Sequence, residues 1–160
     1  MMTTAKSMHL FPSLLAKPLS LVPGRVHATL ISNVLNHLLA GQIDDGELDF
    51  MVGRYLRVEV MDAGIRFDLC FDGGRLLGKG NRRSPDLILS GNVYDFLLLA
   101  TRQEDSDTLF FQRRLKIEGD TDMGLEIKNF LDAIEIESLP FHHVMDRFMG
   151  RAVHLYERLT

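Results

Sequence analysis

The stretch DTLFFQRRLKIEGDTDMGLEIKNFL, residues 107–131, decides the expected fold of this chain. It opens with the adjacent aromatics Phe110 and Phe111 and passes into a strand-like run at 115–117. After a turn at Gly119, apolar residues recur every three or four positions, which predicts a helix with the apolar positions Met123, Ile127, Phe130, Leu131 and Ile134. A strand and a helix joined so closely pack together, because each has one apolar side to bury. The side chains on these apolar sides include few groups that could take part in a reaction. They therefore predict the wall of a pocket for an apolar ligand.

The middle of the chain changes to the period of two that is typical of β-strands. Apolar residues alternate with polar ones over 56–60 and 65–71, and Asp62-Ala63-Gly64 between them suits a hairpin loop. Further strands are expected at 75–80 and 85–89. One face apolar and the other charged predicts a sheet that is covered by helices on one face.

Helical patterns flank these strands on both sides. We expect a short, proline-interrupted helix over 8–22 and a second over 24–39 that ends with Gly41 as its C-cap. Asn92 is a credible N-cap for a helix over 93–101, a short helix follows near 107–113, and 141–159 is amphipathic. The expected class is α+β, with a twisted, five-stranded, mainly antiparallel sheet and helices on one face.

Composition restricts the class of protein. The 160 residues suit one domain, a single cysteine (Cys70) excludes an internal disulfide, and a net charge of −4 argues against nucleic-acid binding. Residues 1–43 contain no acidic residue and carry a formal charge of +3, whereas the remainder is at −7. No secretory signal or membrane-spanning segment is predicted. The apolar, basic start of the chain either contacts a membrane or covers the core.

Three motifs that suggest site chemistry have simpler interpretations. The run at 73–79 resembles a phosphate-binding loop, but Gly80 replaces the required Ser or Thr and a hairpin turn fits better. The start of a calcium loop at Asp120 lacks the later glycine and glutamate, so helix capping is expected there. A third group of residues suits a polar surface: His142, His143, Asp146 and His154. No catalytic residue, metal ligand or cofactor is therefore predicted.

The run from Phe110 to Asp120, with Gly124 and residues 128–131, resembles the signature of the sterol carrier protein type two family. The resemblance implies an α+β fold whose sheet and helices enclose a hydrophobic tunnel. It also implies that the chain binds lipid without catalysis. The expected organisation is an N-terminal extension (1–22), a sterol-carrier-like body (23–136) and a C-terminal amphipathic helix (137–160) within one domain.

Within that family, the chain is most similar to an accessory factor of oxygen-independent ubiquinone biosynthesis. That similarity implies an isoprenoid quinone intermediate or phospholipid as ligand and the UbiU and UbiV hydroxylase proteins as partners. It further implies a cytoplasmic protein that contacts the inner membrane peripherally. An accessory factor of the aerobic pathway and a protein-interaction scaffold with a filled core stay open as alternatives.

We expect the ligand to contact apolar side chains from the helices that follow the sheet. These wall residues are Phe96, Leu97, Leu99, Phe110, Phe111, Leu125, Phe130, Val144, Met145, Phe148 and Met149. Arg113, Arg114 and Lys116 are candidates to hold a headgroup at the mouth of the pocket, or else to form exposed salt bridges.

Overall fold

The computed structural model describes residues 17–18, 21–79, 84–134 and 142–159; for 142–146 and 148–149 it describes the backbone alone. Five strands form one sheet: β1 (Tyr55–Val60), β2 (Ile65–Asp72), β3 (Arg75–Lys79), β4 (Leu87–Gly91) and β5 (Lys116–Gly119). Their order across the sheet is β3-β2-β1-β4-β5. The β1–β4 pair is parallel and the other three pairs are antiparallel. The predicted α+β fold with a mainly antiparallel, five-stranded sheet is confirmed.

Two tight connections set the register of the first three strands. A 3-10 turn (Met61–Ala63) and Gly64, at φ 64°, join β1 to β2, as the predicted hairpin loop requires. Gly73 and Gly74, at φ 61° and 76°, join β2 to β3 in backbone conformations that favour glycine. The hairpin interpretation of the phosphate-loop-like run is therefore confirmed.

The register places apolar side chains on one face of the sheet. Leu56 pairs with both Leu69 and Leu87, so these three leucines lie side by side across β2, β1 and β4. Next to them in the strands, Arg57 pairs with Asp68 and donates from Nε to Asp68 Oδ1 at 2.8 Å on the opposite face. The sheet thus separates an apolar face from a charged one.

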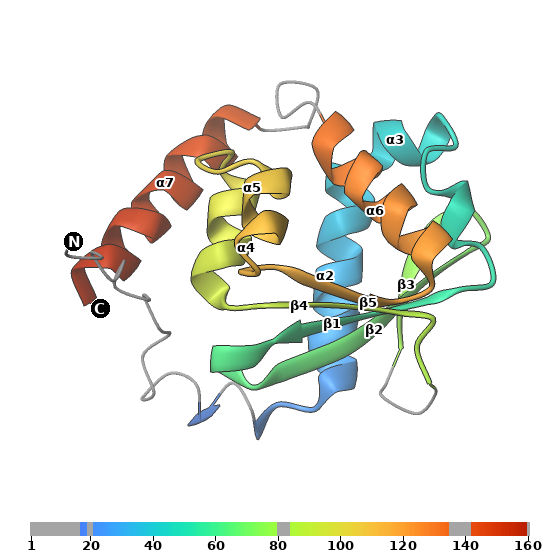
Figure 1. Cartoon of the computed structure of the whole chain (residues 1–160), viewed down its shortest axis with the longest axis horizontal. Helices are drawn as coiled ribbons and strands as arrows, with labels where there is room; N and C mark the ends of the chain where they lie inside the picture. The colour runs from blue at the N-terminus through green and yellow to red at the C-terminus, as the bar shows by residue number, and fades with distance from the viewer. Residues whose placement is uncertain (1–16, 19–20, 80–83, 135–141, 160) are drawn as a thin grey trace.

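Helices cover the apolar face. They are α2 (Gly24–Leu38), α3 (Ala40–Asp44), α4 (Val93–Ala100), α5 (Ser106–Phe111), α6 (Thr121–Ala133) and α7 (His142–Leu159). In Figure 1, α4, α5, α6 and α7 lie on the same side of the sheet. Helix α2 crosses β2 and β3, and Ala28 packs against Phe67 and Leu69. Gly78 allows this close approach, since a Cβ there would lie 2.3 Å from the Ala28 carbonyl.

Some expected boundaries are wrong. Gly41 is not a C-cap: α2 ends at Leu38, and Gly41 lies inside the short helix α3 that follows it. Strand β4 begins at Leu87 instead of Pro85, because proline cannot donate a ladder hydrogen bond. Asp86, the residue between them, binds Tyr55 through its backbone and its carboxylate. Most of the helix expected over 8–22 falls outside the described residues.

Candidate functional site

Two buried apolar clusters meet under the helices. The sheet cluster joins the strands to α6 and the α3 region: Leu39, Leu48, Met51, Leu56, Phe71, Leu76, Leu87, Leu89, Met123 and Ile127. The helix cluster joins α4, α5 and α7: Tyr94, Leu98, Leu109, Leu115, Val153 and Tyr156. Phe96 and Phe110 are half-buried and pack against both clusters. This seam, defined by Phe96 and Phe110, is the centre of the candidate site.

Carboxylate caps start the helices that bring the seam together. The Asp105 carboxylate accepts from the Thr108 N–H at 2.7 Å at the start of α5. Asp120 accepts from the Met123 N–H at 3.0 Å at the start of α6. The capping role predicted for Asp120, in place of a calcium ligand, is confirmed.

Lys128 links α6 to α5 over the seam. Its Nζ lies 5.6 Å from the centroid of the Phe110 ring and 3.2 Å from Asp107 Oδ1. The buried Ser106 hydroxyl also hydrogen-bonds the Asp132 carboxylate. These contacts fix α5 against α6, and with it the position of Phe110.

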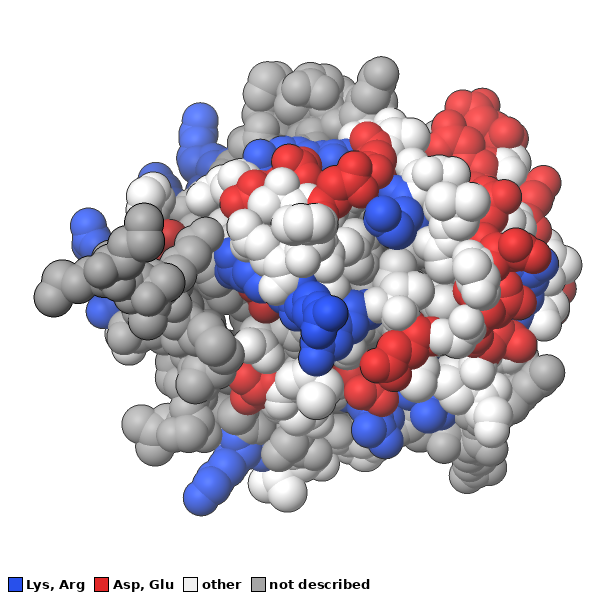
Figure 2. Space-filling model, viewed as in Figure 1, with Lys and Arg blue, Asp and Glu red and all other residues white. Residues whose placement is uncertain are grey.

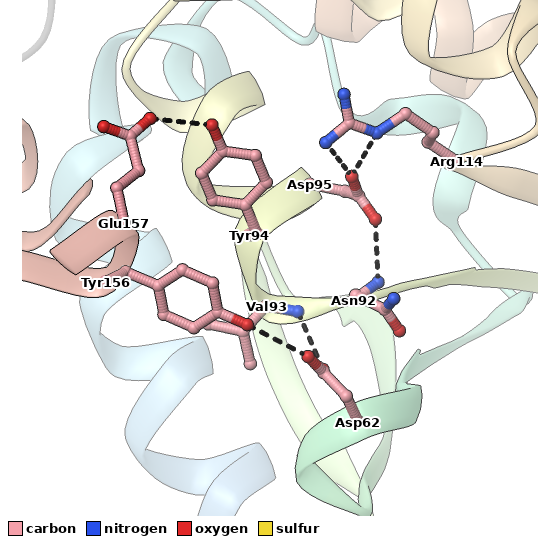
Figure 3. A network of polar contacts seen from close by, with 8 residues as sticks. All are labelled: Asp62, Asn92, Val93, Tyr94, Asp95, Arg114, Tyr156 and Glu157. Carbon is pink, nitrogen blue, oxygen red and sulfur yellow. Dashed lines mark hydrogen bonds and ion pairs between the residues drawn. The ribbon is translucent and has the colours of Figure 1, made fainter. Parts of the chain in front are cut away.

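A polar network anchors α7 at the other side of the seam (Figure 3). The Tyr94 hydroxyl donates to Glu157 Oε1 at 2.8 Å, and the Tyr156 hydroxyl donates to Asp62 Oδ2 at 3.3 Å. The two tyrosine rings stack with their centroids 5.5 Å apart. Burial is the main cause that raises the pKa of both phenols, with the nearby carboxylates adding to it. Both tyrosines are therefore neutral donors at neutral pH.

Arg114 joins the same network from the connection between α5 and β5. Its Nε and Nη2 lie 2.6 and 2.5 Å from Asp95 Oδ1, and its guanidinium carbon lies 5.5 Å from the centroid of the Tyr94 ring. Asp95 is buried, and its Oδ2 accepts from the Asn92 N–H at 3.3 Å. Within the described part of the chain, Arg114 Nη1 is buried and has no hydrogen-bond partner.

We examined the metal-binding and nucleophilic side chains of the described residues. No group of three or more His, Cys, Asp or Glu side chains among the described residues is arranged to hold a metal ion. Cys70 is buried, and burial raises the pKa of its thiol, which opposes a role as nucleophile. Of the predicted histidine group, His154 lies on the surface near Glu157, and the other three side chains fall outside the description.

Comparison with known proteins gives this arrangement a family. The sequence model of the SCP-2 sterol transfer family matches residues 35–132. The chain belongs to this family. The match runs from the end of α2 to the end of α6, so it contains the whole sheet and the seam.

Individual relatives agree. The chain is 41% identical over 136 residues to the ubiquinone biosynthesis accessory factor UbiT of Escherichia coli strain K12. The aligned region covers 85% of this chain and 78% of that protein. Among solved structures, it matches the UbiJ-SCP2 ubiquinone synthesis protein with a TM-score of 0.53 and 21% identity, over 66% of this chain and 92% of the other. The second likeness shows the fold. The resemblance stated from the sequence is thereby confirmed.

The structure divides the predicted wall residues of this family member into three groups. Phe96, Leu97, Leu99, Phe110 and Phe130 are half-buried and pack against one or both clusters. Phe111 and Leu125 lie at the surface, 90% and 60% exposed. Val144, Met145, Phe148 and Met149 belong to α7, but their side chains are outside the described part of the structure. Contact of any of them with a ligand stays a prediction.

The three predicted headgroup residues do not converge. Arg113 and Lys116 are exposed, and Arg113 has a φ of 58° after the end of α5. Arg114 between them points into the polar network. Sequence reasoning missed the acceptors and aromatic partners of this network: Asp62, Tyr94, Asp95, Tyr156 and Glu157. The spacing of Asn92 and Asp95, which forms a capping box, was the one local signal for any of them.

The described surface offers two further observations. None of the described helices combines the length and hydrophobicity that crossing a bilayer requires. Figure 2 shows acidic side chains gathered on the side of α3 and α6, where six of them are exposed: Asp44, Asp45, Glu47, Asp49, Asp122 and Glu126. This side disfavours an anionic surface.

Proposed function

We propose that the chain is a non-catalytic lipid-binding accessory factor of oxygen-independent ubiquinone biosynthesis. It holds an isoprenoid quinone precursor or a phospholipid between the sheet and the helices. The observation that carries this proposal is the 41% identity to UbiT over 85% of the chain, because the name of that relative assigns it to ubiquinone biosynthesis. Membership of a sterol transfer family supports a lipid as the ligand.

The seam is the proposed place of the lipid. Phe96 and Phe110 pack against both clusters but are only half-buried, so each keeps exposed apolar surface at the seam that a lipid can cover. Each methylene that a lipid buries there contributes about 0.8 kcal/mol. An isoprenoid tail therefore binds without any charged contact along its length.

The remaining wall residues extend this site. Leu97, Leu99 and Phe130 continue the wall beside the seam, and we assign further ligand contacts to Val144, Met145, Phe148 and Met149 in the sequence of α7. Phe111 and Leu125 form an outer rim that meets the lipid as it enters, in keeping with their exposure. A headgroup at the mouth meets Arg113 and Lys116.

Loading requires a partner or a membrane, since a lipid with a long tail hardly exists free in water. We assign membrane contact to the acid-free start of the chain, including residues 1–22, because it carries positive charge whereas the α3–α6 side is acidic. Residues 23–136 form the lipid-binding body and 137–160 close it. UbiU- and UbiV-like hydroxylases receive the ligand in the cytoplasm, at the periphery of the inner membrane.

Native mass spectrometry of the gently purified chain, followed by lipid extraction, tests the proposal. We expect a mass that exceeds the chain by one lipid, identified as an isoprenoid quinone intermediate or a phospholipid. A clean apo mass after expression in a ubiquinone-producing bacterium would refute lipid carriage and favour the scaffold with a filled core.

Two neighbouring phenylalanines supply a matched pair of variants. Phe110→Ser places a hydroxyl in the seam and should remove most of the co-purifying lipid. Phe111→Ser changes the same residue type at the rim, where the side chain is 90% exposed, and should leave the amount of bound lipid unchanged. Equal loss in both variants, or in neither, would contradict the proposed position of the lipid.

A further inference from the structure

Arg114 has one hydrogen-bond donor group, Nη1, that no described residue accepts. A guanidinium carries five N–H donors in a fixed plane. In Arg114, Nε and Nη2 both face Asp95 Oδ1, whereas Nη1 is buried and finds no acceptor among the described residues. A buried, charged donor without an acceptor is unfavourable, so an acceptor that reaches it gains more than it would at the surface.

The surroundings hold that donor in one place. Asp95 binds one edge of the guanidinium, and the ring of Tyr94 lies beside it, with 5.5 Å between the ring centroid and the guanidinium carbon. Asp95 is in turn fixed by the Asn92 N–H, and Tyr94 by Glu157. In Figure 3, the unused nitrogen points away from Asp95. The donor is therefore preorganised for an acceptor that comes from outside the network.

The position adjoins the seam. A Cβ placed on Gly91 would lie 3.2 Å from the Arg114 carbonyl oxygen and 3.4 Å from Cε2 of the Phe96 ring. Phe96 therefore lies close to the residue that carries the donor. The next residue, Leu115, and the stacked Tyr94 both belong to the helix cluster. The backbone of Arg114 thus lies beside Phe96 and the helix cluster, and Asp95, which binds its guanidinium, directly precedes Phe96 in α4.

The local charge selects the kind of acceptor. Three carboxylates, Asp62, Asp95 and Glu157, belong to the network, and Arg114 is its one cation. The Arg114 charge is already balanced by Asp95, and the two other carboxylates leave a negative surplus. An anionic phosphate or carboxylate would be repelled at this depth, whereas a neutral oxygen accepts the hydrogen bond without that cost.

We infer that Arg114 Nη1 donates a hydrogen bond to a neutral oxygen of the bound lipid, a carbonyl or a phenol oxygen, and so sets its position along the seam. The inference rests on the proposed lipid-binding function. A quinone or phenol ring and the ester carbonyl of a phospholipid both supply this chemistry.

Three probes of matched size test the inference on the purified full chain by equilibrium dialysis. The first is ubiquinone with a tail of two isoprene units, and the second is a fully alkylated benzene with the same tail and no oxygen. The third is palmitate, which has a charged oxygen pair. Competition by a diacylglycerol then tests whether an ester carbonyl binds at the same position as the quinone.

The wild-type chain should bind the quinone at least about tenfold more tightly than the hydrocarbon, because a hydrogen bond from a charged donor stabilises the complex by enough for a tenfold change in Kd. Arg114→Lys keeps a cation beside Asp95 but removes Nη1, and should reduce this preference to about twofold or less. Arg66→Lys, the same change at a half-exposed arginine on the charged face of the sheet, should leave it intact. Thermal unfolding of both variants confirms that they fold.

The outcomes separate the inference from the function on which it rests. Equal affinity of the wild-type chain for quinone and hydrocarbon would mean that a water molecule satisfies Nη1, which overturns the inference and leaves lipid binding standing. Palmitate as the tightest probe, with a preference that Arg114→Lys removes, would overturn the neutral class of ligand. Absence of binding by all probes would overturn both proposals.

Discussion

The sheet cluster and the helix cluster are held together by different forces, although they meet at one seam. The buried residues of the sheet cluster are all apolar, and its helix α6 is positioned by a cap and by side-chain contacts at its surface. The helix cluster contains Tyr94 and Tyr156 and borders the buried pair Asp95–Arg114. Side-chain shape therefore determines the packing of the sheet cluster, whereas polar pairing determines how α4 and α7 pack beside it.

This difference suits a protein that holds an apolar ligand between the halves. A cluster without polar groups tolerates an oily molecule along its edge, because no hydrogen bond has to be broken. A hydrogen-bonded half keeps its geometry through directional contacts, even where it is not closely packed. Substitutions in the two halves should therefore differ in both kind and size.

The largest effect is expected from Asp95→Ala. The change leaves the mostly buried Arg114 guanidinium without its partner and removes the acceptor of the Asn92 N–H. Breaking a buried pair on one side costs about 3–5 kcal/mol of the free energy of unfolding. This loss of the free energy of unfolding is measured by urea unfolding. The control, Asp107→Ala, breaks the 3.2 Å pair with Lys128, whose two side chains are both exposed, and should cost less than about 1 kcal/mol. Similar losses of stability in both variants would contradict a structural role for the Asp95–Arg114 pair greater than that of an exposed ion pair.

Gly78→Ala should produce the next largest effect, through shape alone, where α2 lies against β3 beside the buried group of Ala28, Phe67 and Leu69. The new Cβ would lie 2.3 Å from the backbone of Ala28, so α2 must move away from β3. Overpacking of this kind costs about 1–3 kcal/mol. Gly41→Ala adds the same methyl group inside α3, where nothing lies within 4 Å, and should be neutral or slightly stabilising. A Gly78→Ala variant as stable as the wild type would show that α2 is not seated as closely as described.

Tyr156→Phe tests the polar half with a smaller change. It removes the 3.3 Å hydrogen bond to Asp62 and keeps the ring that stacks on Tyr94. The expected loss is about 1 kcal/mol, measured by thermal unfolding. Hydrogen exchange should show the opening concentrated in α7, because the bond joins that helix to the turn before β2. Uniform exchange across the sheet would instead mean that α7 and the sheet open together.

The smallest effect is expected from alkaline pH. Burial raises the pKa of Tyr94 and Tyr156 above the ordinary value of 10.0, so above that pH the unfolded chain releases phenol protons that the folded chain retains. Stability should thus be constant near neutral pH and fall as the pH rises past about 10. Urea unfolding at pH 8 and 10.5 measures the fall, which should be shallower in Tyr156→Phe. Identical slopes in the two proteins would contradict the burial of this phenol.

Local patterns predicted most of the fold because they depend on neighbours in the chain. The period of two identified the strands, and Asp120 and the glycines at 73–74 marked a helix start and a turn. The parallel pairing of β1 with β4 depends instead on where the chain returns after β3, which no local pattern encodes. The C-cap prediction for Gly41 was wrong for a related reason. The short helix α3 follows α2 directly, so Gly41 lies within a helix instead of at the end of one.

The site was less predictable. The apolar pattern of 93–101 and the adjacent aromatics at 110–111 made Phe96, Phe110 and Phe111 candidates, but only the fold packs Phe110 against the core and leaves Phe111 at the surface. The polar network joins residues far apart in the chain, such as Tyr156 and Asp62. Such pairs depend on the docking of α7, so spacing along the chain cannot reveal them.

Photo-crosslinking tests the central claim most directly. A short-tailed ubiquinone analogue with a diazirine in its tail is bound to the full chain, irradiated, and located by peptide mass spectrometry. We expect labelled peptides from α4, α5 and α6, with Phe96, Phe110 or Phe130 at the modified positions, and loss of label when unmodified quinone competes. Label confined to the outer face of α2 or the charged face of the sheet, or label that no competitor reduces, would contradict it.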